Sequence, residues 1–199
     1  MIEKLISLGV TMVTTPNYSL FSNAPRWDDL HSMKRIALVH AEFQQAGLLS
    51  ALHVNGRTKA DFGRWGDLIA ERPEITHIAY EFTTGAGRAE RRNLHTRWLR
   101  GLAEHIGRPL TLVVRGGHEL VPELAEAFAQ VVILDTSAFM KAMKRQRAAR
   151  RGNVGIEWLA SPTGVDEPLD EIFEHNVQVI SEVLGLLAAP PLRNFGTAA

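Results

Sequence analysis

Cysteine is absent from the 199-residue chain. Its absence excludes disulfides, thiolate nucleophiles, zinc–thiolate sites and iron–sulfur clusters. The chain also lacks an excess of charge of either sign, because 22 basic residues balance 22 acidic ones. A neutral chain has no overall field that attracts nucleic acid or an anionic membrane. Any such attraction has to come from a local patch of charge.

Long apolar runs and targeting signals are missing as well. No stretch reaches transmembrane length, and the opening MIEKLISLGV carries an acid and lacks the hydrophobic core of a signal peptide. We therefore expect a cytoplasmic protein that does not associate with membranes. No glycine- or serine-rich linker is present, and the length suits one well-buried core. This predicts a single β/α domain over residues 1–189, followed by a loose tail over residues 190–199.

What the chain does have is a central stretch, ITHIAYEFTTGAG at residues 75–87. The nearly continuous apolar run is typical of a strand buried on both faces. Glu81 closes the strand, and a glycine-rich turn then leads into a helix that begins near residue 89. A buried carboxylate is costly unless it is paired or used. The pattern predicts that Glu81 is the centre of an active-site corner, where its pKa rises or a cation compensates its charge.

Strand and helix patterns alternate about six times along the chain. Strands are expected at residues 10–13, 48–54, 75–82, 110–114, 131–134 and 154–159. Helices are expected at residues 27–46, 62–71, 89–106, 121–128, 139–150 and 169–187. Such alternation predicts an α/β fold with a parallel sheet and right-handed crossovers.

Two architectures compete for this pattern: an incomplete or shortened TIM-barrel-like fold, and a doubly wound open sheet. A full barrel needs eight units and about 250 residues. Polar residues follow nearly every expected strand, which favours the barrel, because the strand ends of a barrel all converge on one mouth. An incomplete barrel has exposed strand edges. We therefore expect a dimer or a protein partner that covers the open edge of the sheet.

The runs TTPNYSLFSNAPR, HVNGRT, ERPEITHIAYEFTTGAGR, LVVRGG and DTSAFMKAMKRQRA resemble a family of uncharacterised bacterial proteins. That family is carried on plasmids and phages and bears only the description of a domain of unknown function. The resemblance extends from about Val10 to Arg147. It implies a truncated TIM-barrel-like fold and a mobile genetic element as the context. The family has no established catalytic residues, so the resemblance implies no reaction.

Glu81 and Asp135 are the candidate catalytic residues. Both follow strands that are not adjacent in the chain, so they are placed to flank a ligand across the mouth. Paired carboxylates serve as acid and base, or as nucleophile and acid. The alternative is that each forms a structural ion pair with an arginine such as Arg57 or Arg115. The sequence leaves both interpretations open.

Polar residues and glycine turns at the strand ends are the candidate ligand-binding residues. Exposed turn amides beside an arginine suit phosphate, although these turns match neither a Walker loop nor the dinucleotide fingerprint. Histidine and carboxylate groups also suit a divalent metal, but no tight ligand spacing such as HExxH is present, so the metal is left unknown. The candidates are His53, Asn55, Arg57, Thr83, Thr84, Arg115, Gly116, Gly117 and His118.

A basic segment lies within the helix expected at residues 139–150 and just beyond it. Its candidate nucleic-acid-binding residues are Lys141, Lys144, Arg145, Arg147 and Arg151. Such density suits contacts with a phosphate backbone, whereas the alternative is a solvated outer helix. Two functions follow from the sequence. One is an enzyme acting on a phosphorylated or nucleotide-like substrate at the mouth of the strands, and the other is a non-catalytic accessory protein that binds nucleic acid or protein.

Overall fold

The computed structural model describes residues 2–20, 23–83, 89–152, 155–164 and 166–188. The chain divides into two compact units, Met1–Leu134 and Asp135–Ala199, which we call unit 1 and unit 2. The sequence analysis expected one domain over residues 1–189, whereas each unit has a sheet and helices of its own. The expected tail lies outside the described residues. Within the described part of the chain, no helix combines the length and the apolar character needed to cross a membrane.

Unit 1 contains a five-stranded parallel sheet in the order β1-β2-β3-β4-β5. The strands are β1 (Met12–Thr14), β2 (Leu49–His53), β3 (His77–Glu81), β4 (Thr111–Arg115) and β5 (Gln130–Ile133). The sheet does not close, because β1 and β5 remain its two edges. The predicted α/β fold with parallel strands is therefore confirmed in its open, shortened form. The covering of the open edges by a second copy or a partner stays a prediction.

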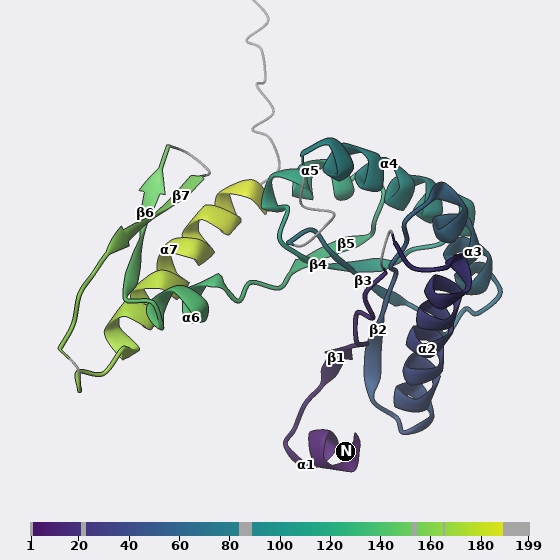
Figure 1. The fold of residues 1–199 in the computed structure, drawn as a ribbon, viewed down its shortest axis with the longest axis horizontal. Helices are drawn as coiled ribbons and strands as arrows, with labels where there is room; N and C mark the ends of the chain where they lie inside the picture. Colours follow the sequence, from purple (N-terminus) through teal and green to yellow (C-terminus); the bar gives the residue numbers. More distant parts are fainter. Residues whose placement is uncertain (1, 21–22, 84–88, 153–154, 165, 189–199) are drawn as a thin grey trace, which may run out of the picture. The chain divides into compact units, whose positions relative to one another are not determined.

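A short helix precedes the first strand of unit 1, and the other helices connect its strands, as the alternating pattern predicted. They are α1 (Ile2–Ser7), α2 (Arg26–Gln45), α3 (Lys59–Ala70), α4 (Ala89–Ile106) and α5 (Val121–Leu124), with a 3-10 turn η2 (His118–Leu120) before α5. Helices α2, α3, α4 and α5 follow one another around the sheet (Figure 1). Side chains from all four join one core cluster with the strands, so these helices cover the same face. A doubly wound sheet would have helices on both faces.

The two faces of the sheet differ in what their side chains contact. Because side chains alternate along a strand, Ile78, Tyr80 and Phe82 lie in the core cluster beneath the helices. The alternate residues of β3 therefore point to the opposite face, which we call the inner face. Its centre is made of the small side chains Ala51, Ala79 and Val113, from three neighbouring strands. Glu81 lies on this inner face, at the carboxyl end of β3.

Unit 2 contains α6 (Ser137–Ala142), β6 (Gln146–Arg151), β7 (Gly155–Ala160) and α7 (Asp170–Ala188). Strands β6 and β7 pair antiparallel and form a separate two-stranded sheet. The predicted basic helix over residues 139–150 is therefore wrong. Helix α6 ends at Ala142, and Arg145 adopts a left-handed conformation with φ 51°, which a helix cannot continue through. The chain then enters a strand, and the expected last strand is its partner.

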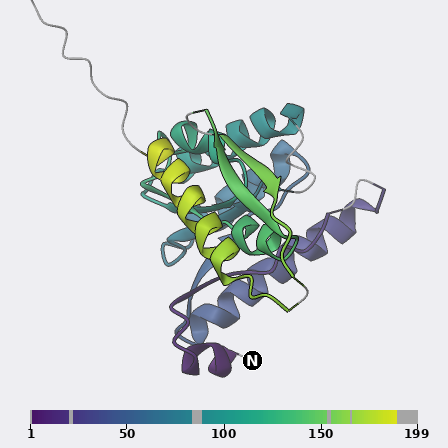
Figure 2. The same ribbon diagram turned by 90° about the vertical axis from the view of Figure 1, so that its left-hand side faces the viewer.

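Helix α7 closes one edge of strand β6. The side chain of Asn176 is fully buried, and its Oδ1 accepts a hydrogen bond from the amide of Ala148 at 2.7 Å. Its Nδ2 donates to the carbonyl of Gln146 at 3.0 Å, and His175 bonds the carbonyl of Ala148 at 2.9 Å. These side chains thus bond the backbone groups of β6 that a third strand would otherwise pair with on this edge. Figure 2 shows α7 lying beside the hairpin that this contact supports.

Candidate functional site

Glu81 is held by three side chains at the carboxyl ends of the strands. Asn17 donates to its Oε2 at 3.1 Å, and the hydroxyl of Thr83 donates to Oε1. Arg115, directly opposite on β4, donates to Oε1 at 3.5 Å. The carboxylate side chain is only 14% exposed, whereas the guanidinium side chain is 44% exposed. Glu81 is therefore a fixed acceptor beside a cation that reaches solvent.

The charge of Glu81 is stabilised despite its burial. Burial raises the pKa of the carboxyl group, but the hydrogen bonds from Thr83 and Asn17 and the nearby charge of Arg115 outweigh it. The pKa of Glu81 consequently lies below its ordinary value. The sequence offered two outcomes, a raised pKa or a compensating cation, and the structure has the second. Glu81 is ionised at neutral pH and has no proton to donate.

His53 lies beside this carboxylate at the end of β2. Its backbone amide donates to the Oγ1 of Thr15 at 2.8 Å, and its ring stacks near Tyr80 with centroids 6.4 Å apart. The residue is 6% exposed, and no group in the described part of the chain hydrogen-bonds its Nδ1. Burial lowers the pKa of His53 to about 4, although the charge of Glu81 opposes the shift. The ring is therefore neutral at pH 7, and its Nδ1 is a buried polar atom without a partner in the described residues.

Asn55, a candidate ligand-binding residue, hydrogen-bonds two residues that follow β1. Its Nδ2 donates to the Oδ1 of Asn17 at 2.6 Å and to the carbonyl of Tyr18 at 2.9 Å. Asn17 is the residue that donates to Glu81, so Asn55 acts on the carboxylate through it. Trp65 on α3 anchors the backbone of Asn55 through a bond of 2.8 Å from its indole N–H to the carbonyl. Asn55 is thus linked to Glu81 through Asn17, and its role as a ligand-binding residue stays a prediction.

The glycines after β4 are explained by packing. Gly116 and Gly117 have φ of 73° and 68°, a left-handed region that favours glycine. A Cβ at Gly116 would lie 2.7 Å from the Cγ2 of Thr83, and one at Gly117 would lie 2.9 Å from the ring of Phe82. The turn is thereby held against the residues that follow β3. His118 opens the three-residue turn η2, where it is half-buried.

Arg57 belongs to a buried ionic network. Its NH1 donates to the Oδ2 of Asp29 at 2.8 Å, and its backbone amide donates to the Oδ2 of Asp61 at 2.9 Å. Both carboxylates are buried, and Asp61 also pairs with Arg26 and accepts from the amide of Thr58. Burial raises the pKa of Asp61, but the hydrogen bonds and the charge of Arg26 lower it by more. The pKa of Asp61 therefore lies below its ordinary value. The network joins the starts of α2 and α3, next to the end of β2.

Asp135 follows β5 and lies in unit 2. Its Oδ1 accepts a hydrogen bond from the amide of Ser137 at 2.7 Å and from the hydroxyl of the same residue at 2.7 Å. A carboxylate in this position stabilises the start of a helix, here α6. Because Asp135 and Glu81 belong to different units, their pairing as two catalytic carboxylates stays a prediction. Thr84, the other candidate next to Glu81, lies outside the described residues.

Metal ligands do not gather at Glu81 or elsewhere in the described residues. No group of three or more histidine, aspartate and glutamate side chains is arranged to hold a metal ion in that part of the chain. Glu81 and His53 supply only two such groups, whereas a catalytic zinc site, for example, takes three ligands from the protein.

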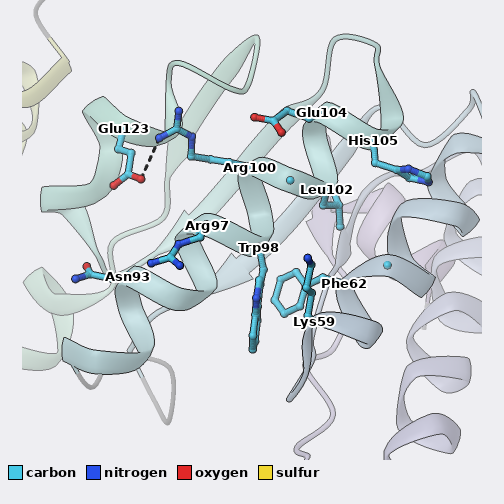
Figure 3. Close-up of a pocket in the computed structure, with 12 residues that line it drawn as sticks. Lys59, Phe62, Asn93, Arg97, Trp98, Arg100, Leu102, Glu104, His105 and Glu123 are labelled. Atoms are coloured by element: carbon cyan, nitrogen blue, oxygen red, sulfur yellow. Dashed lines mark hydrogen bonds and ion pairs between the residues drawn. The ribbon is translucent and has the colours of Figure 1, made fainter.

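A groove of about 1070 Å³ lies on the helical side of unit 1, between α3 and α4 (Figure 3). Trp98 and Lys59 line it, together with Arg100, which pairs with Glu123 at 3.1 Å. Trp98 also stacks on His95 at 4.9 Å, as part of the packing of α4. The groove contains neither the ionised carboxylate nor the buried imidazole described above. The groove has ionisable side chains of its own, among them Glu104 and His105, and it lies apart from the inner face that carries Glu81 and His53.

No family model, no curated protein and no solved structure matches this chain. The expected membership of a family carried on mobile elements therefore stays a prediction. The function is inferred from the site alone.

Proposed function

We propose that unit 1 is an enzyme that acts on a phosphorylated or nucleotide-like substrate at the carboxyl ends of β2, β3 and β4. The observation that carries the proposal is the pairing of an ionised, nearly buried Glu81 with a neutral, buried His53 whose Nδ1 has no partner in the described residues. A buried polar group without a hydrogen bond costs about 1–3 kcal/mol. A ligand that bonds this nitrogen would remove that cost.

The roles of the residues follow from their charge states. Glu81 is ionised, so it serves as a general base or a nucleophile and not as an acid. His53 is neutral, so its imidazole donates or accepts a hydrogen bond according to its tautomer, and a substrate that bonds the buried Nδ1 has to displace the residues that cover it. Arg115 presents a partly exposed guanidinium, whose planar fork matches a phosphate group. A sugar phosphate has both kinds of group, hydroxyls for the carboxylate and a phosphate for the arginine.

The test is a titration of the full chain with ribose 5-phosphate, AMP and inorganic phosphate, followed by calorimetry and by the imidazole NMR signals of His53. We expect a phosphorylated sugar or nucleotide to shift the His53 signals. Glu81→Gln keeps the shape of the side chain but removes its charge, and hydrogen bonds to charged groups contribute about 1.5–3 kcal/mol. Binding should therefore weaken about tenfold or more.

Glu42→Gln is the matched control, because Glu42 is an exposed glutamate on α2 of the same unit. It should bind the probes as the unchanged protein does. If no probe shifts the His53 signals, or if Glu81→Gln binds as well as Glu42→Gln, the enzyme proposal fails. A non-catalytic accessory protein is then the better account.

A further inference from the structure

The hairpin β6–β7 of unit 2 has two unlike faces. Pairing places Ala148 opposite Trp158, and Ala148 is buried in the unit. The alternate residues point the other way, and most of them are exposed. We call this side the ribbon face. Its members are Arg147, Ala149 and Arg151 from β6, with Gly155, Glu157 and Leu159 from β7.

The arginines of the ribbon face are available to a partner. Arg147 and Arg151 are exposed, and neither forms an ion pair with any residue that the structure describes. Other cations of the basic segment are engaged within unit 2. The ammonium of Lys141 lies 5.1 Å from the centre of the Trp158 ring, and Arg145 donates to Thr163 at 2.8 Å. Of the predicted basic residues, Lys141 and Arg145 thus contact other residues of unit 2, whereas Arg147 and Arg151 are exposed on the ribbon face.

The charge of the hairpin is concentrated on a chain that is neutral overall. Residues 146–160 contain three arginines and one carboxylate, Glu157, whereas the full chain has equal numbers of basic and acidic residues. A local excess of this kind is the electrostatic signature of a surface for a polyanion. Ala149 lies between the two arginines, and Gly155 lies opposite Arg151. Because these two residues have small side chains or none, a binding partner can come close to the backbone of the ribbon face.

The spacing fits a regular duplex. Arg147 and Arg151 are four residues apart on one strand, which is about 13 Å at a strand rise of about 3.3 Å per residue. That distance is close to four base-pair steps of about 3.4 Å. The major groove of B-form DNA admits a two-stranded β-ribbon, whereas the major groove of A-form RNA is deep and narrow. Single strands need aromatic side chains for stacking, and Trp158 lies on the opposite face, beneath Lys141.

We propose that the hairpin β6–β7 binds duplex DNA by placing its ribbon face in the major groove, with Arg147 and Arg151 contacting the DNA backbone. This interaction is independent of the proposed small-molecule site at Glu81. Arg147 and Arg151 are both carried on strand β6, which pairs with β7 and is bonded by α7.

The experiment measures fluorescence anisotropy of a labelled duplex of about 20 base pairs against the full chain, at salt concentrations from about 50 to 200 mM. Each phosphate contact adds about −0.9 to the slope of log affinity against log salt. The double variant Arg147→Gln with Arg151→Gln should reduce the slope by about 2 and weaken binding roughly 60-fold in 0.1 M salt. Arg91→Gln with Arg97→Gln is the matched control, because it removes two exposed arginines from α4 of unit 1. It should leave affinity and slope nearly unchanged.

A second variant changes affinity in the opposite direction. Glu157→Gln removes the only carboxylate of the ribbon face, so duplex DNA should bind it several-fold more tightly. This gain in binding is a result that misfolding would not produce. Tighter binding of single-stranded DNA or duplex RNA than of duplex DNA overturns the proposal. Equal affinity in the ribbon variant and its control, or no binding of the duplex at low salt, overturns it as well.

Discussion

His53→Leu should make the protein more stable at neutral pH and less sensitive to acid. The substitution replaces a buried imidazole by an apolar side chain. In the native protein the ring is 6% exposed, and its Nδ1 has no hydrogen bond in the part of the chain that the structure describes. If the nitrogen is kept for a substrate, then folding alone gains nothing from it. Removal of the imidazole should therefore benefit stability while it removes ligand binding.

The magnitude at pH 7 comes from two opposing contributions. An unsatisfied buried polar group costs about 1–3 kcal/mol, and this cost disappears in the leucine variant. The ring contact with Tyr80, at 6.4 Å between centroids, is also lost, and aromatic pairs contribute about 0.5–1.5 kcal/mol. The balance favours the variant by about 1 kcal/mol.

Acid adds a larger difference. The pKa of His53 is about 4 in the folded protein and 6.5 in an ordinary histidine, so between these values the unfolded chain binds the proton first. The native protein therefore loses stability as the pH falls from 6.5 to 4, by about 3 kcal/mol from this residue. Burial also lowers the pKa of His40 and His95, and their share of the loss is the same in both proteins. Only the share of His53 disappears in the variant.

Urea unfolding of the two proteins at pH 7 and at pH 4 measures both effects. His77→Leu is the control, because His77 lies on the next strand and its Nδ1 already has a partner in Thr76 at 2.8 Å. It should give no gain in stability and should keep the acid sensitivity of the native protein. A loss of stability in His53→Leu at pH 7, together with an unchanged response to acid, would refute the reasoning. The imidazole would then be a bonded part of the core.

Two further substitutions test the ionic network and the closed edge of β6. Asp61→Asn removes the buried charge that Arg26 and the amides of Arg57 and Thr58 bond, so we expect a loss of about 3 kcal/mol in urea unfolding at pH 7, whereas the exposed Asp67→Asn should cost little. The same measurement should show the contribution of Asp61 disappearing as the pH falls below about 3.9, because the pKa is lowered in the folded state. Asn176→Ala leaves the amide of Ala148 without its partner, so that amide should exchange hydrogen faster, whereas the exposed Gln178→Ala should leave it unchanged.

The strands and helices of unit 1 were predictable because each is an apolar run that glycine, proline or a polar turn interrupts. The central strand, expected at residues 75–82, forms over His77–Glu81. Helix α3 starts at Lys59, three residues before the first apolar residue of the expected helix. The reason is a capping box between Thr58 and Asp61. The sequence TKAD contained that signal, and it also pointed to the buried carboxylate that the sequence analysis missed.

The hairpin of unit 2 was not predictable from local preferences. Lysine, arginine, glutamine and alanine all favour helices, so residues 139–150 have a helical composition. The helix is ended by the left-handed Arg145, and a non-glycine residue in that conformation gives no signal in the sequence. Strand β6 then depends on β7 and on the side chains of α7, which are contacts between distant residues.

The sequence predicted which residues lie at the strand ends near Glu81, but it did not predict the hydrogen bonds between them. Glu81, Arg115 and Thr83 were expected at the strand ends, and the structure joins them through hydrogen bonds. Alternation along the strands identifies which side chains share a face. It does not show that the amide of Asn55 is turned toward Asn17, or that the Nδ1 of His53 is left without a bond. Those features depend on loops, whose conformation follows from packing at several distant positions.

The buried side chain of Asn176 has a consequence for self-association. An open strand edge presents unpaired N–H and C=O groups, on which a second chain can add a strand. At Gln146 and Ala148 such groups are already bonded by an amide that belongs to a helix. Another chain would have to displace α7 before it paired there. The hydrogen bonds from Asn176 that hold the hairpin in place thus also prevent another strand from pairing with β6 at these residues.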